Sequence, residues 1–141
     1  MNEMVKLDAV FEAEHVFDTE SSQRFARMAG DLNPMHHDTA HAAASRFGRL
    51  IASGTETTAR MMGLNATHFA QFGPTVGLEF SFRFRRAVPM EARTLIRWII
   101  TEIEPKPDLG TIVACAGTLT LLDTGVIALE GTSKGVLLET A

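Results

Sequence analysis

Alternation of apolar and polar residues marks the second half of the chain. In residues 76–86, apolar side chains occupy the even positions from Val76 to Phe84, and polar residues lie between most of them. A period of two over nine residues predicts a β-strand. Three further segments alternate or are continuously apolar, are bounded by turn residues, and span residues 92–104, 111–122 and 126–138. We therefore expect four antiparallel strands joined by hairpins, with Ile96, Trp98 and Ile100 on one face of the second and residues 111–122 as a central strand.

The first half of the chain has a different pattern. Residues 7–18 alternate partially and predict a short strand, and residues 19–30 predict a helix with Phe25 and Met28 on one face. Asp18 or Thr19 can cap this helix, and Gly30 can end it in a left-handed turn. Proline disfavours helix for the residue before it, so we expect residues 31–36 to be ordered but not helical.

Two more helices are expected before the strands begin. Asp38 can cap a short helix over residues 39–47. A longer helix is expected to begin near Gly54 and to be mostly buried, because residues 51–69 are apolar on more than one side. Glu56 and Arg60 lie four residues apart and can pair on this helix. One strand, several helices and four antiparallel strands together predict an α+β fold with a buried helix against a sheet.

Composition narrows the class of protein. The 141 residues, with 45% hydrophobic and 21% charged side chains, predict a single globular domain over residues 1–141. A net charge of −4 without a basic run argues against nucleic-acid binding. We expect no membrane span and no leader, hence a cytoplasmic protein, since no apolar stretch is long enough and the first twenty residues carry acids. The single cysteine, Cys115, is expected to be a buried small hydrophobe.

Polar chemistry is concentrated in residues 25–38, with the sequence FARMAGDLNPMHHD. A metal site is disfavoured, because His37 and His41 have no third ligand in a matching pattern. His15, His37, His41 and His68 are expected to be structural or exposed. Acid–base catalysis by Asp31 and His36 is a further possibility, since histidine exchanges protons near neutral pH and a carboxylate can orient it or share a water with it. Their spacing alone leaves this interpretation and a purely structural one open.

Residues 25–54 resemble a known signature. The order Gly-Asp-x-Asn-Pro-x-His, followed by alanines, a phenylalanine, an Ile-Ala step and Gly54, is similar to that of the MaoC-like (R)-specific enoyl-CoA hydratases. The resemblance implies a hot-dog fold, in which an antiparallel sheet wraps around a central helix. It also implies a homodimer or a dimer of dimers, with the two sheets of a pair joined into one and acyl sites at their interface.

The resemblance also implies roles for individual residues. Asp31 and His36 would hold and activate a water that adds across the double bond of a trans-2-enoyl-CoA, or is lost from a 3-hydroxyacyl-CoA. Gly54 would donate its backbone N–H to the thioester oxygen, which agrees with the positive partial charge at a helix N-terminus. Asn33 and Pro34 would shape the loop beside the substrate. No bound cofactor is expected, because coenzyme A enters as part of the substrate.

The sequence departs from the family pattern at the start of the long helix. The family usually has histidine before the helix glycine, where this chain has Ser53, and Thr55 and Glu56 follow the glycine. If Ser53, Thr55 and Glu56 face the substrate, they make the site more polar than a plain fatty chain prefers, which suggests a short, polar or unusual acyl group. Glu56 can instead pair with Arg60.

Two other functions stay open at this point. A hot-dog thioesterase would use the same fold and oxyanion glycine, but such enzymes do not usually contain the Gly-Asp-x-Asn-Pro-x-His signature. A non-catalytic acyl-thioester-binding protein would explain the change to Ser53, although it would not explain why Asp31 and His36 are retained. Five arginines, Arg83, Arg85, Arg86, Arg93 and Arg97, are candidates for contacting the phosphates of coenzyme A.

Overall fold

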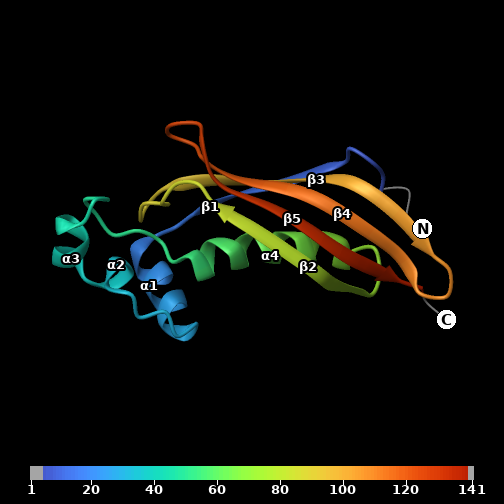
Figure 1. Cartoon of the computed structure of the whole chain (residues 1–141), viewed down its shortest axis with the longest axis horizontal. Helices are drawn as coiled ribbons and strands as arrows, with labels where there is room; N and C mark the ends of the chain where they lie inside the picture. Colours follow the sequence, from blue (N-terminus) through green and yellow to red (C-terminus); the bar gives the residue numbers. More distant parts are fainter. Residues whose placement is uncertain (1–4, 140–141) are drawn as a thin grey trace.

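The computed structural model describes residues 5–139 of the chain. Five antiparallel strands form one sheet in the order β1-β3-β4-β5-β2, and this sheet curves over the long helix α4 (Figure 1). Three shorter helices, α1 to α3, gather beside the N-terminal end of α4 (Figure 1). The arrangement confirms the predicted α+β hot-dog fold.

Alternation located all five strands to within a few residues. The strands are β1 (Val10–Val16), β2 (Thr75–Phe84), β3 (Arg93–Lys106), β4 (Gly110–Leu121) and β5 (Val126–Leu138). Strand β4 is central, as expected. Asp108, at a positive φ of 70°, lies in the short turn between β3 and β4, and Gly125, at 75°, lies in the next turn.

The helices are α1 (Thr19–Met28), α2 (Pro34–His37), α3 (Thr39–Ala44) and α4 (Gly54–Ala70). Asp18 caps α1 by accepting a hydrogen bond from the Ser21 N–H, and Gly30 follows the helix at a φ of 79°. Asp38 caps α3 in the same way. Helix α3 ends at Ala44 instead of residue 47, because Ser45 is extended and its hydroxyl bonds the Ala42 carbonyl. Among residues 5–139, no helix is long and apolar enough to cross a membrane.

The core lies between the sheet and α4. Ile96, Trp98 and Ile100 point to this side of β3, and each is at least 97% buried. The Trp98 indole N–H donates a 2.9 Å hydrogen bond to the Met61 carbonyl of α4, which fixes the helix against the sheet. Cys115 of β4 is buried, as predicted, and its burial raises the pKa of the thiol to about 11.

One further expectation for the first half of the chain is wrong. Residues 34–37 form the short helix α2, although residues 31–36 are predicted to be ordered but not helical. Proline restricts only the residue before it, here Asn33, and is itself favoured at the first position of a helix. In α1, Met28 is 84% exposed, and the buried side of the helix is formed by Ser22 and Ala26.

The apolar side chains of β2 are not fully covered. Val76, Leu78 and Phe84 are each at least half exposed. Strand β2 is at an edge of the sheet, and its register shifts between Gly77 and Glu79, so that Leu78 has no partner residue on β5. Val76 and Phe80 pair with Val136 and Ser133, which are three residues apart on β5, so the shift places Val76 and Phe80 on opposite faces of the sheet.

Candidate active site

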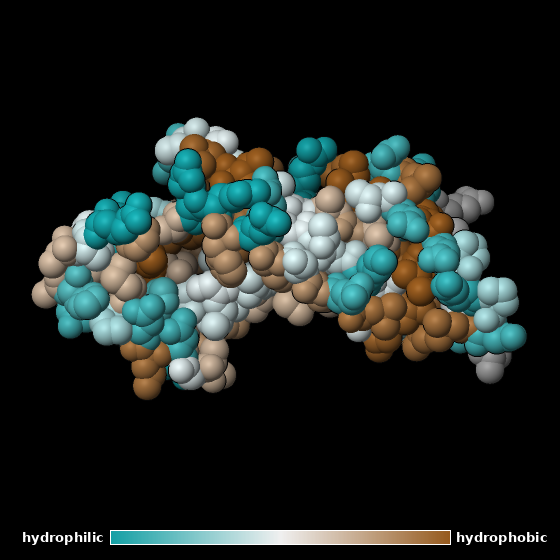
Figure 2. Space-filling view, in the orientation of Figure 1, coloured by the Kyte–Doolittle hydropathy of each residue, from teal (hydrophilic) through white to brown (hydrophobic). Residues whose placement is uncertain are grey.

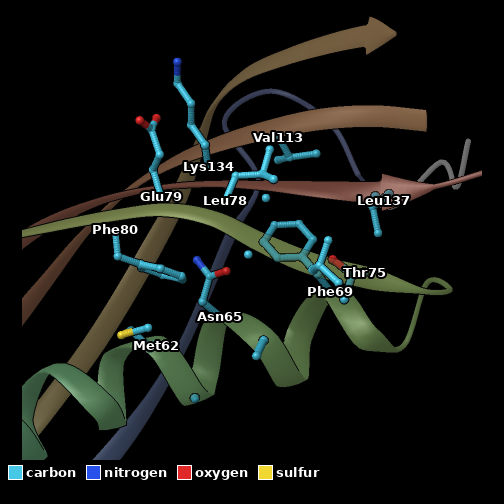
Figure 3. A pocket seen from close by; sticks show the side chains of 15 residues that line it. Met62, Asn65, Phe69, Thr75, Leu78, Glu79, Phe80, Val113, Lys134 and Leu137 are labelled. Carbon is cyan, nitrogen blue, oxygen red and sulfur yellow. The ribbon is translucent and has the colours of Figure 1, made fainter. Parts of the chain in front are cut away.

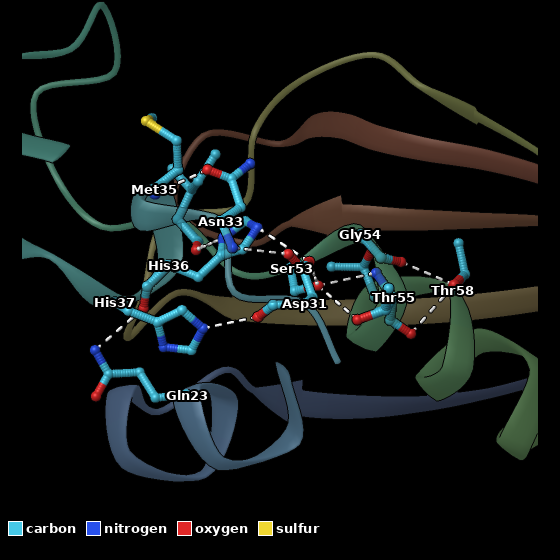
Figure 4. A network of polar contacts seen from close by, with 12 residues as sticks. Gln23, Asp31, Asn33, Met35, His36, His37, Ser53, Gly54, Thr55 and Thr58 are labelled. Carbon is cyan, nitrogen blue, oxygen red and sulfur yellow. Dashed lines mark hydrogen bonds and ion pairs between the residues drawn. The ribbon is translucent and has the colours of Figure 1, made fainter. Parts of the chain in front are cut away.

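The signature residues Asp31, Asn33 and His36 follow the end of α1. Asn33 is extended, and its side-chain oxygen accepts a 3.1 Å hydrogen bond from the Met35 N–H, so that it caps α2. His36 lies within this one-turn helix and is 5% exposed. The capped helix thus turns the His36 side chain towards the segment that precedes α4 (Figure 4).

The His36 ring is fixed by a hydrogen bond. Its Nδ1 lies 2.7 Å from the Ile51 carbonyl oxygen. Because a carbonyl oxygen only accepts, Nδ1 carries the hydrogen, and Nε2 of the neutral ring holds a free lone pair. Nε2 lies 3.3 Å from Oδ2 of Asp31. The structure therefore places a potential base directly beside a carboxylate.

The Asp31 carboxylate is held at both oxygens. Its Oδ1 accepts a 3.2 Å hydrogen bond from the Asn33 N–H, and its Oδ2 accepts a hydrogen bond from the Ser53 hydroxyl. The Ser53 hydrogen bond is the largest cause of a lowered pKa of Asp31, followed among the lowering causes by the Asn33 N–H and by the positive charge that His36 and His37 have when protonated. Hydrogen bonds to the charged form keep this carboxyl group ionised.

The first turn of α4 leaves one backbone donor free beside this pair. Ser53 caps the helix: its hydroxyl accepts a 3.1 Å hydrogen bond from the Thr55 N–H, and its carbonyl accepts from the Glu56 and Thr57 N–H groups. Among the hydrogen bonds of residues 5–139, the Gly54 N–H has no acceptor. The helix N-terminus adds positive partial charge at this donor.

His36 and Gly54 line the same groove, which has a volume of about 510 Å³. Phe84 lies against Gly54, and a Cβ atom at position 54 would come within 3.0 Å of the Phe84 ring. Three arginines, Arg46, Arg85 and Arg86, line the groove as well. It therefore combines a base, a free N–H donor and cationic walls.

Of the five predicted arginines, two line the groove and three do not, and Arg83, which is exposed, is one of the three. Arg85 and Arg86 line the groove, and Arg85 also pairs with Glu130 at 3.1 Å. Arg93 and Arg97 pair with acids elsewhere on the sheet, at 3.7 Å from Asp123 and 3.8 Å from Glu12.

Glu56 and Thr55 lie differently with respect to the groove. Glu56 is fully buried, its Oε2 lies 3.1 Å from both Nε and Nη2 of Arg60, and it does not belong to the groove lining. The pairing expected from their spacing is therefore present. His15 of β1 lies 4.0 Å from the same oxygen. The Thr55 hydroxyl bonds the Ser53 hydroxyl and so belongs to the network around Asp31 (Figure 4).

Sequence analysis missed three side chains that support or line the site. The His37 Nε2–H donates to the Asp31 carbonyl at 2.8 Å, and Gln23 of α1 donates to the His36 carbonyl at 3.1 Å. Arg46 reaches the groove from the segment after α3. The sequence offers no periodic signal for these residues, because all three contacts depend on how the short helices pack.

Comparison with known proteins assigns the chain to a family. A family profile described as MaoC like domain matches residues 3–110. No curated protein matches the chain.

Several solved structures have the same fold. A MaoC-like dehydratase from Rhodospirillum rubrum is 25% identical, with a TM-score of 0.80 over 99% of this chain and 97% of that one. An (R)-hydratase from A. caviae involved in PHA biosynthesis is 21% identical, with a TM-score of 0.84 over 96% and 99%. The R-hydratase PhaJ1 from Pseudomonas aeruginosa is 24% identical, with a TM-score of 0.77 over 96% and 84%. Since the family profile spans most of its length, the chain belongs to the MaoC-like dehydratase family.

Proposed function

We propose that this protein is a hydro-lyase that reversibly adds water to a trans-2-enoyl-CoA, or removes it from a 3-hydroxyacyl-CoA. The observation that supports this function best is that His36, whose Nε2 lies 3.3 Å from the Asp31 carboxylate, lines the same groove as Gly54, whose N–H is free among the described residues. Hydration of an enoyl thioester needs one group to take a proton from water and another to stabilise the charge on the carbonyl oxygen.

The acid–base pair is suited to holding one water molecule. Both His36 Nε2 and Asp31 Oδ2 are acceptors, so a water can donate one hydrogen to each and keep a lone pair for attack. As its oxygen bonds to the β-carbon, a proton passes to His36 and the electron pair of the double bond moves towards the thioester oxygen. The acid–base pair of His36 and Asp31 then returns a proton to the α-carbon, which completes the addition.

The Gly54 N–H would stabilise the enolate that forms in between. Removal of one such donor costs about 3 kcal/mol of transition-state stabilisation in enzymes that use backbone donors. Because Ser53 accepts hydrogen bonds from the other N–H groups of the first turn, the Gly54 N–H is the donor that remains for the substrate. Arg46, Arg85 and Arg86 would contact phosphates of the coenzyme A portion.

A second cavity offers space for an apolar group. It has a volume of about 600 Å³ and lies between the C-terminal half of α4 and the strands β2 and β5 (Figure 3). Phe69, Phe80 and Leu137 provide apolar walls, and the buried Asn65 points towards the cavity from the helix (Figure 3). The Asn65 amide donates a 3.1 Å hydrogen bond to the Ser133 hydroxyl, so the lining that remains is mainly apolar and suits an acyl chain.

We also propose that the chain forms a homodimer through β2. This strand is an edge of the sheet, and Val76 and Leu78 expose about half of their surface. Figure 2 shows hydrophobic surface gathered at the end of the molecule where β2 begins. An exposed apolar edge strand is a template for pairing with another strand. Sedimentation velocity is expected to give a dimer for the wild type and a monomer for Leu78→Lys; a monomeric wild type would refute this assembly.

The enzymatic proposal is tested with crotonyl-CoA. Hydration is followed by the loss of enoyl-thioester absorbance, and a thiol reagent detects any hydrolysis in parallel. We expect hydration by the wild type and a fall of roughly 100-fold or more in Asp31→Ala and His36→Ala. His41→Ala is the matched control, because His41 is exposed on α3 and does not line the groove.

Each other outcome contradicts the proposal in a different way. Free thiol without hydration would identify a thioesterase. Binding of crotonyl-CoA and of longer and 3-hydroxylated acyl-CoAs, without turnover of any of them, would identify a non-catalytic acyl-thioester-binding protein.

A further inference from the structure

Ser53 occupies an unusual position between the acid–base pair and the helix N-terminus. Its side chain is completely buried, and its hydroxyl contacts Asp31, the Thr55 N–H and the Thr55 hydroxyl (Figure 4). A serine hydroxyl has one hydrogen to donate and two lone pairs that accept. These three contacts therefore use its entire hydrogen-bonding capacity.

The direction of each hydrogen bond follows from the chemistry of the partners. An ionised carboxylate only accepts, so the hydrogen between Ser53 and Asp31 belongs to Ser53. The Thr55 N–H only donates, and the Thr55 hydroxyl must then donate as well, because Ser53 has no second hydrogen. The network is polarised in one direction, from Thr55 through Ser53 to Asp31.

We propose that Ser53 is a positioning residue for the reaction, which orients the Asp31 carboxylate without contacting the substrate. The inference rests on the proposed function for its kinetic consequence, but the effect on Asp31 is independent of it. The sequence departs from the resembled signature at this residue, where the family usually has histidine. A small, buried hydroxyl replaces a large imidazole here and is bonded directly to the catalytic carboxylate.

The geometry explains why such a donor matters. The Asn33 N–H binds Oδ1 and Ser53 binds Oδ2, so that rotation of the carboxylate would break two hydrogen bonds at once. Oδ2 is also the oxygen that faces Nε2 of His36. Without Ser53, only the Asn33 N–H holds the carboxylate, and the spacing between Oδ2 and His36 Nε2 is less firmly fixed.

The charge of Asp31 depends on the same contact. The Ser53 hydroxyl lowers the pKa of Asp31 more than any other neighbour does. Among residues 5–139, the titratable groups that face this carboxylate are His36 and His37, both from α2, whereas the segment before α4 contributes the Ser53 hydroxyl. Loss of that hydroxyl is therefore expected to raise the pKa of Asp31 towards its ordinary value.

Ser53 also caps α4, so the test must separate capping from positioning. Alanine is a poor N-cap, whereas glycine caps nearly as well as serine. Ser53→Ala and Ser53→Gly both remove the hydrogen bond to Asp31, but only Ser53→Ala weakens the helix appreciably. A purely structural role predicts that Ser53→Gly behaves like the wild type, and a positioning role predicts that both variants lose activity equally.

The first readout is kcat/KM for crotonyl-CoA hydration. We expect both variants to lose roughly 10- to 100-fold in kcat/KM, since a hydrogen bond to a charged group is lost. Ser53→Thr, which keeps the hydroxyl, is expected to restore the wild-type kcat/KM. The matched control is Ser22→Ala, because Ser22 is equally buried in α1 and its hydroxyl has no hydrogen-bond partner.

The second readout needs no activity. Protein labelled with ¹³C at the aspartate carboxyl groups is titrated by NMR, and the Asp31 signal is assigned with Asp31→Asn. The pKa of Asp31 is expected to be lower in the wild type and Ser22→Ala than in Ser53→Ala and Ser53→Gly. An unchanged Asp31 titration in both Ser53 variants, or a Ser53→Gly variant with wild-type kinetics, would overturn the inference. A wild type that fails to hydrate crotonyl-CoA would count against the proposed function alone, because the titration still decides the role of Ser53.

Discussion

Gly117→Ala tests whether the packing and hydrogen bond of Trp98 hold α4 against the sheet. Gly117 of β4 lies directly opposite Trp98 of β3 in the sheet. A Cβ atom at position 117 would lie 2.5, 2.6 and 2.8 Å from three carbons of the indole ring. The ring has no room to move, because it is fully buried and its N–H is bonded to the Met61 carbonyl.

The expected cost has two parts. Overpacking of a buried site costs about 1–3 kcal/mol, and the loss of the indole hydrogen bond adds about 1 kcal/mol. A total of about 2–4 kcal/mol corresponds to a fall in Tm of roughly 6–15 °C for a chain of this size. Both the free energy of unfolding in urea and Tm should show this loss, at matched protein concentration.

Gly63→Ala is the matched control. Gly63 lies in the interior of α4, and a Cβ atom there would have no neighbour within 4 Å. Alanine is favoured over glycine inside a helix by about 1 kcal/mol, so this variant should be as stable as the wild type or slightly more stable. If Gly117→Ala unfolded at the wild-type temperature, the position of Trp98 would not be what fixes α4 against the sheet.

Three further results are expected. Glu56→Gln should lower the free energy of unfolding in urea by about 1–3 kcal/mol, because Arg60 loses its charged partner at a fully buried position; wild-type stability would contradict this. Cys115 should not react with a thiol reagent at pH 8 until the protein unfolds, because it is buried and its pKa is raised to about 11. Burial lowers the pKa of both His15 and His68, so the unfolded chain binds more protons than the folded protein just below about pH 6.5. The free energy of unfolding should therefore decrease as the pH is lowered through this range. Urea titrations at pH 7 and pH 5 should show this loss, and a His15→Gln/His68→Gln double variant should lose less; an equal loss would refute the assignment.

The strands were predictable because alternation is a local property. Ile96 and Trp98 share a face of β3, and the same face packs on α4 as their spacing predicts. Val76 continues the same alternation as Phe80, yet the register shift at Leu78 places the two residues on opposite faces of the sheet. Alternation therefore predicts a strand, but it does not reveal a β-bulge within the strand, which changes the face of the residues beyond it.

The helices show where local rules compete. Pro34 disfavours helix for Asn33 and yet begins α2 itself, because its effect on the residue before it differs from its effect on the residues after it. Glu56 allowed two interpretations from sequence, one facing the substrate and one paired with Arg60. The pairing is what the structure contains, and the turn of the helix that brings Glu56 against β1 instead of the groove was not evident from spacing.

The site itself depends on contacts between two irregular segments. The Ile51 N–H donates to the Met35 carbonyl and the Ile51 carbonyl accepts from the His36 ring, so one backbone bond and one side-chain bond join residues 33–36 to residues 51–54. These bonds set the tautomer of His36 and bring Ser53 against Asp31. The resemblance identifies Asp31, His36 and Gly54 as separate candidates, whereas no periodic pattern predicts the contact between residues 33–36 and 51–54 that brings them together. The chemistry of Asp31 and His36 therefore depends on this contact as much as on the two side chains.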